Sequence, residues 1–181
     1  MVAEPVQEIT DEIVELAQEM IEIVLREPGL GLAAPQVGES LRLVVVRFDA
    51  EDEEKEKPRI IPLLNPKVAE RSEETVQGRE GCLSLPTLYG DVERASEVLV
   101  KAVSLDGEEV EIEASGLGAR VLQHEVDHLD GVLFIDRVVE DTLVWLIPDE
   151  DEESGYREKP TTIDEVVERF EKLRQRQQSR A

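Results

Sequence analysis

Residues 115–131 read Ser-Gly-Leu-Gly-Ala-Arg-Val-Leu-Gln-His-Glu-Val-Asp-His-Leu-Asp-Gly and hold both histidines of the chain. The spacing of the apolar residues predicts a largely buried helix that begins at Ser115 or Gly116 and runs through Asp130. Gly131 is well placed to end this helix. Because residues four apart share one face of a helix, His124 and His128 can reach the same metal ion.

Glu125 follows the first histidine directly, as the general base does in hydrolases with an H-E-x-x-H motif. It lies about 100° around the helix from His124, which makes it a poor third ligand. From there it could take a proton from a water on the metal and pass it to a leaving amine. Simple packing of the histidines in a buried helix is disfavoured, because the neighbouring carboxylate would then be buried at a cost in free energy.

Cys82 is the only cysteine, in the segment Glu80-Gly-Cys-Leu-Ser-Leu-Pro86. One thiolate and two imidazoles give three protein ligands and leave a fourth position open, as in catalytic rather than structural zinc sites. This donor set suits Fe(II), Zn(II), Ni(II) or Co(II). A lone cysteine forms no intramolecular disulfide, which argues against a disulfide-stapled secreted domain.

Hydrolysis of an amide also needs hydrogen-bond donors for the oxyanion. Gln36 offers an amide donor after the glycine-bearing loop Gly29-Leu-Gly-Leu-Ala-Ala-Pro-Gln36, and the backbone N–H of Leu83 is a second candidate. The competing interpretation of this loop as a dinucleotide-binding motif is weak, because it follows a helix and lacks a third glycine. Asp127 could orient a ligand or pair with an arginine, or it could be a plain surface acid.

Composition limits the class of protein. A chain of 181 residues with 40% hydrophobic residues predicts one domain with a substantial core. A net charge of −23 disfavours DNA as a partner. We find no signal peptide and no membrane-length apolar run, so we expect a cytoplasmic protein without membrane association. The basic segment Arg169–Arg180 could bind ribosomal RNA, but stabilisation of a helix C-terminus is the favoured interpretation.

The sequence as a whole predicts an α+β fold. In it, small antiparallel or mixed sheets pack around the helix that carries H-E-x-x-H, with helices at both ends. An N-terminal helix is predicted from apolar residues at helical spacing between Ile13 and Leu25, with Thr10 as its N-cap and Pro28-Gly29 as its end, and a capping box at Thr162–Glu165 begins a last helix over 162–181. Strands are predicted at 41–48, 60–65, 67–71, 97–103, 108–113 and 132–139, a loop at 29–36, a solvated charged loop at 49–57 and an acidic flexible loop at 149–161.

Three segments, 29–36, 80–86 and 123–128, resemble the signature motifs of peptide deformylases in their order and spacing. The resemblance covers about Pro5 to Val139. It implies removal of the formyl group from N-formylmethionine of nascent peptides, which yields formate and a free methionyl N-terminus. It also implies that Cys82, His124 and His128 hold a metal, most often Fe(II) in this family.

The same resemblance implies further roles. Glu125 would act as the base on metal-bound water, and Gln36 with the Leu83 N–H would form the oxyanion hole. Arg94 would lie near the site and pair with Asp127. The residues that would line the methionine pocket, or else pack in the core, are Leu30, Gly31, Leu117 and Val121. Two departures from the family are a short segment before Pro5 and a stretch at 139–162 without a counterpart.

Two other functions fit parts of the pattern. A zinc endopeptidase would need Asp136 or Glu140 as its third ligand and would leave Cys82 without a role. A diverged metal-binding protein without catalysis is disfavoured by the presence of both Glu125 and Gln36. Loss of metal in a Cys82→Ser variant would rule against the endopeptidase, and retained metal without turnover would favour the metal-binding protein.

Overall fold

The computed structural model describes residues 2–48 and 59–178. Within these residues the chain has three α-helices and two β-sheets, which confirms the predicted α+β class. The chain divides into two compact units. Residues 1–76 and 94–133 form the first, and residues 77–93 and 134–181 form the second.

The first unit contains a five-stranded antiparallel sheet in the order β1-β2-β3-β6-β7. Its strands are β1 (Gly31–Ala33), β2 (Leu43–Arg47), β3 (Ile60–Arg71), β6 (Glu97–Val103) and β7 (Glu109–Ser115). The predicted hairpin at Asp106-Gly107 is confirmed. Gly107 has a φ of +83°, a left-handed conformation that glycine adopts without strain.

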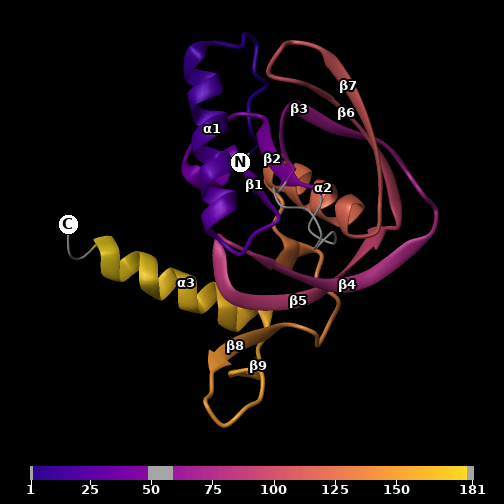
Figure 1. Cartoon of the computed structure of the whole chain (residues 1–181). Helices are drawn as coiled ribbons and strands as arrows, with labels where there is room; N and C mark the ends of the chain where they lie inside the picture. The colour runs from indigo at the N-terminus through magenta and orange to yellow at the C-terminus, as the bar shows by residue number, and fades with distance from the viewer. Residues whose placement is uncertain (1, 49–58, 179–181) are drawn as a thin grey trace. The chain divides into compact units, whose positions relative to one another are not determined.

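Two helices cover this sheet. Helix α1 (Asp11–Arg26) packs against β1, β2 and β3, and α2 (Gly116–Leu129) packs against all five strands (Figure 1). Alternate residues of a strand point to opposite faces. Val44 and Val46 lie in the same apolar cluster as Leu122 and Val126 of α2. Leu43 and Val45 of the opposite face are equally buried, so β2 is covered on both sides.

The second unit contains most of β4 (Thr75–Cys82) and β5 (Leu85–Ala95), followed by β8 (Val144–Pro148) and β9 (Tyr156–Pro160). Their sheet order is β4-β5-β8-β9. A two-residue turn at Leu83–Ser84 joins β4 to β5. Helix α3 (Ile163–Gln178) follows, and its Val166 is buried. The predicted capping box is confirmed, since the Glu165 N–H donates to Thr162 Oγ1 at 3.3 Å and the Thr162 N–H donates to the Glu165 carboxylate at 3.4 Å.

Several local predictions were wrong. The segment predicted as a strand at 132–139 contains a short 3₁₀ helix at Phe134–Asp136, and only Val138 forms a β-bridge, with Val92. Its apolar pattern instead reflects the burial of Phe134 and Ile135. The two strands predicted on either side of Pro66 are the single strand β3. A shift of register between Leu64 and Lys67 accommodates the proline, which cannot donate to a strand ladder.

The predicted loops also differ from the structure. The loop at 29–36 contains β1 and a 3₁₀ helix at Ala34–Val37. The acidic loop predicted over 149–161 is a turn followed by β9, while strands β4, β5 and β8 were not predicted. Thr10 occupies the N-cap position of α1, but its side chain makes no capping hydrogen bond. The charged loop at 49–57 and residues 179–181 of the predicted last helix lie outside the described residues. None of the helices within the described residues has both the length and the apolar character needed to cross a membrane.

Candidate active site

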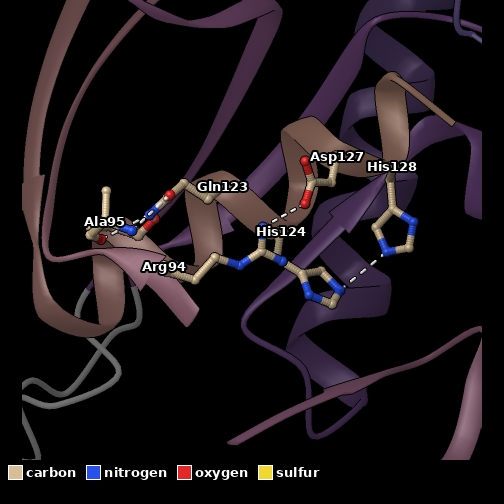
Figure 2. A network of polar contacts seen from close by, with 7 residues as sticks. Arg94, Ala95, Gln123, His124, Asp127 and His128 are labelled. Atoms are coloured by element: carbon tan, nitrogen blue, oxygen red, sulfur yellow. Dashed lines mark hydrogen bonds and ion pairs between the residues drawn. The ribbon is translucent and has the colours of Figure 1, made fainter. Parts of the chain in front are cut away.

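His124 and His128 lie one turn apart on α2 with their rings turned toward each other (Figure 2). Their Nε2 atoms are 3.1 Å apart, and the rings meet edge to face with centroids 4.8 Å apart. Two imidazole nitrogens on one tetrahedral metal ion, each at about 2.0–2.1 Å from it, would be separated by about 3.3 Å. The observed spacing therefore suits a shared metal ion.

Cys82 is the last residue of β4 and, as the only cysteine of the sequence, forms no disulfide within the chain. Its sulfur and the ligand nitrogens of His124 and His128 all lie within 4.8 Å of one another, so the group could hold a metal ion. Cys82 and His124 are partly buried, and His128 is buried. One thiolate with two imidazoles is a donor set that binds Fe(II), Zn(II) and similar ions.

Glu125 is buried, with only 4% of its surface exposed, and it lies against Gly31 of β1. A Cβ at Gly31 would lie 2.7 Å from Glu125 Cγ and 2.8 Å from Cδ, and closer still to Oε1. No side chain fits between the two residues. The absence of a side chain at position 31 therefore leaves the space that the Glu125 carboxyl group occupies. This is in addition to the pocket role predicted for Gly31.

Gln36 lies in the 3₁₀ helix after β1, where its side-chain oxygen accepts a hydrogen bond of 2.7 Å from the Ala33 N–H. Since only the oxygen of an amide can accept, this contact sets the orientation of the group and directs the NH₂ away from Ala33. Leu83 lies in the turn directly after Cys82. The predicted donors thus lie in two short segments, the 3₁₀ helix that follows β1 and the turn between β4 and β5.

Asp127 forms an ion pair with Arg94 at 2.5 Å, with both side chains less than a tenth exposed. Asp127 is therefore not a surface acid, and the pair expected from the resemblance is present. One turn earlier, Gln123 binds the neighbouring residue Ala95 (Figure 2). Its amide nitrogen donates to Ala95 O at 3.0 Å, and its oxygen accepts from Ala95 N at 3.2 Å. The sequence analysis missed Gln123, although a polar residue among the apolar positions of a buried helix signals an internal hydrogen bond.

The four residues predicted for the methionine pocket all lie in the first unit. Val121 belongs to the apolar cluster, and Leu30 and Leu117 pack against it. Gly31 contacts Glu125. Core packing thus accounts for part of this set, and its contribution to a substrate pocket stays a prediction.

The chain is similar to known proteins both in sequence and in structure. The sequence model of the polypeptide deformylase family matches residues 1–143. The chain belongs to the polypeptide deformylase family. It is 45% identical over 148 residues to a peptide deformylase of Thermomicrobium roseum, covering 81% of this chain and 84% of that protein.

Solved deformylase structures agree. The peptide deformylase of Synechococcus elongatus in complex with actinonin has a TM-score of 0.71 and 41% identity, over 77% of this chain and 74% of that one. The class I type b enzyme of Acinetobacter baumannii bound to Met-Ala-Ser has a TM-score of 0.69 and 40% identity, over 76% of this chain and 90% of that one.

The chain is thus an enzyme, a peptide deformylase, of a family that acts on nascent formylated peptides. The resemblance of the three motifs to this family is confirmed. The family match ends at residue 143, so β8, β9 and α3 lie outside it.

Proposed function

We propose that this chain removes the formyl group from N-formylmethionyl peptides by metal-dependent hydrolysis, with Cys82, His124 and His128 as the metal ligands. The observation that carries the proposal is the proximity of these three ligand groups, with the buried Glu125 next to one of them on α2. A divalent metal, Fe(II) by preference and Zn(II), Ni(II) or Co(II) as substitutes, would supply the Lewis acidity that makes water a nucleophile at neutral pH.

The protein residues would divide the remaining work. Glu125 takes the proton of the attacking water and gives it to the leaving amine of methionine, so that formate and a free N-terminus result. The Gln36 NH₂ and the Leu83 N–H donate to the oxygen of the formyl group as negative charge develops on it. The methionine side chain binds in an apolar pocket lined by Leu30, Gly31, Leu117 and Val121. Arg94 and Asp127 support α2 behind the ligands.

The test is formate release from formyl-Met-Ala-Ser by protein reconstituted anaerobically with Fe(II). The proposal expects rapid release by the wild type and a loss of at least about 10²-fold in Glu125→Ala, as for removal of a general base. Glu140→Ala is the matched control, because Glu140 is exposed and is an alternative metal ligand only in the endopeptidase interpretation. Equal rates for Glu125→Ala and wild type would contradict the assignment of the base.

We further propose that the enzyme works in the cytoplasm and that the basic end of α3 is the segment to test for ribosome contact. Within that helix, the Arg169 guanidinium lies 4.4 Å from the centroid of the Trp145 ring, and Lys172 pairs with Glu168. Arg174 and Arg176 are exposed. Co-sedimentation with ribosomes that is lost in an Arg174→Glu/Arg176→Glu variant would support the contact, and unchanged sedimentation would contradict it.

A further inference from the structure

The segment beyond the family match pairs with the β4–β5 hairpin, in which Cys82 is the last residue of β4. Strand β8 pairs with β5, where Leu88 faces Trp145 and Tyr89 faces Val144, and β9 pairs with β8. The second unit therefore contains two strands, outside the family match, that extend the sheet of β4 and β5.

Tyr89 lies directly against Gly81, the residue before Cys82. A Cβ at Gly81 would lie 2.5 Å from Tyr89 Cε1 and 2.8 Å from Cδ1, so the ring occupies the place of any side chain there. The backbone of β4 can approach the ring this closely only because position 81 is glycine. The position of the ring and the path of the strand next to Cys82 are thus linked.

The Tyr89 ring also contacts Arg79 of β4, and Arg79 in turn pairs with Glu158 of β9. The Arg79 guanidinium lies 5.3 Å from the centroid of the Tyr89 ring, within the range of a cation–π contact. Arg79 also pairs with Glu158 of β9 at 2.5 Å. Both partners of this ion pair are about half exposed, so its contribution to stability is small. The ion pair nevertheless restrains the Arg79 guanidinium, and the planar guanidinium in turn restrains the Tyr89 ring over which it lies.

We propose that Tyr89 is a positioning residue for Cys82, and that Glu158 of β9 acts on the same strand through Arg79 and the Tyr89 ring. The 144–160 hairpin thereby slows the loss of metal from the site. This inference rests on the proposed role of Cys82 as a metal ligand.

The test uses protein loaded with Co(II), in which a thiolate ligand gives a sulfur-to-cobalt charge-transfer band. Gly81→Ala is expected to weaken this band and to accelerate metal release to a chelator at least tenfold, because its Cβ cannot fit beside the ring. The double variant Gly81→Ala/Tyr89→Leu is expected to release metal at the rate of Tyr89→Leu alone, since the obstructing ring is gone. Tyr89→Phe keeps the ring and is expected to match the wild type.

The contribution of β9 is tested with Glu158→Gln. This variant is expected to release metal about two- to fivefold faster than the wild type, the range that an exposed ion pair provides. Glu152→Gln is the matched control, because Glu152 is an exposed acid of the turn between β8 and β9. Equal release rates for Glu158→Gln and Glu152→Gln would overturn the part of the proposal that concerns β9.

Further outcomes distinguish a failure of this inference from a failure of the proposed metal site. A wild-type cobalt protein without the charge-transfer band would overturn Cys82 as a ligand, and this inference with it. A wild-type band that persists unchanged in Gly81→Ala, with an unchanged release rate, would overturn the inference alone. If Gly81→Ala does not fold, the comparison of Tyr89→Leu with Tyr89→Phe decides, and equal release rates for these two variants would overturn it.

Discussion

Arg94 and Asp127 form an ion pair in a part of the first unit that is almost closed to water. Two charges in such a place are stable only together, because each compensates the desolvation of the other. Asp127 precedes His128 directly, so the pair also limits the movement of a proposed metal ligand. The pair therefore links the stability of the unit to the geometry of the site.

We predict that Arg94→Ala lowers the free energy of unfolding by about 3–5 kcal/mol, the usual effect of removing one partner of a buried pair. Metal content and turnover are expected to fall with it. Urea unfolding, metal analysis and formate release measure the three quantities. The double variant Arg94→Met/Asp127→Leu is expected to recover most of the stability, because neither member of the pair then leaves the other as an unpaired buried charge. Unchanged metal content and turnover in Arg94→Ala would show that the pair has no role at the site.

Position 31 accepts only glycine, because any side chain there would overlap the Glu125 side chain. We predict that Gly31→Ala lowers the turnover number at least tenfold while metal content stays near that of the wild type, because the new Cβ displaces the Glu125 carboxyl group but no ligand. Gly118→Ala is the control: its Cβ would meet only Ala114 and Phe48 at ordinary distances of 3.8 and 4.0 Å. A Gly31→Ala enzyme with normal turnover would contradict the steric relation between Gly31 and Glu125.

At the scale of elements, the position of α2 matters most, because α2 carries both histidines and Glu125. Gln123 fixes this helix to the end of β5 by two hydrogen bonds with the backbone of Ala95. A third bond joins its amide to the carbonyl oxygen of Ala119 within α2. The bonds to Ala95 act like a short piece of β-ladder between a helix side chain and a strand, and they restrain rotation of α2 about its axis.

We predict that Gln123→Met destabilises the protein by about 1–3 kcal/mol or more, because it leaves buried backbone groups of Ala95 without their partner. It is also expected to speed metal release, since α2 is then less firmly held. Gln18→Met, on the exposed face of α1, is the matched control for the same chemical change. Thermal unfolding and chelator kinetics provide the readouts, and identical values for the two variants would refute the anchoring role.

At the scale of the whole molecule, both compact units are built from two separate stretches of chain. Strands β4 and β5 each begin in one unit and end in the other, at residues 76–77 and 93–94. Because neither unit is a continuous segment, we expect the chain to behave as the single catalytic domain that the sequence predicts.

We predict one cooperative unfolding transition. Trp145, the only tryptophan, is buried in the second unit, whereas α1 and α2 belong to the first. Tryptophan fluorescence and far-ultraviolet circular dichroism should therefore give the same urea midpoint if the units unfold together. Two separate midpoints would show that the units are independent domains.

Features that depend on residues close in sequence were predicted well. The helical spacing of His124 and His128, the turn at Asp106-Gly107 and the capping box at Thr162 all arise from contacts within a few residues. The order of the three motifs was also enough to predict the family. In contrast, the predicted strand at 132–139 failed because a short apolar run is equally compatible with a buried 3₁₀ turn.

Contacts between distant segments were decided by the fold. Gln123 and Ala95 are 28 positions apart, and no local sequence pattern predicts that the Gln123 side chain will bond to the Ala95 backbone. The same holds for the close approach of Gly31 to Glu125, and for β9, whose residues are all exposed and carry no apolar alternation. The sequence alone determines which chemical groups are present and how they are spaced along the chain. Where each group lies in space depends on which strands and helices pack together.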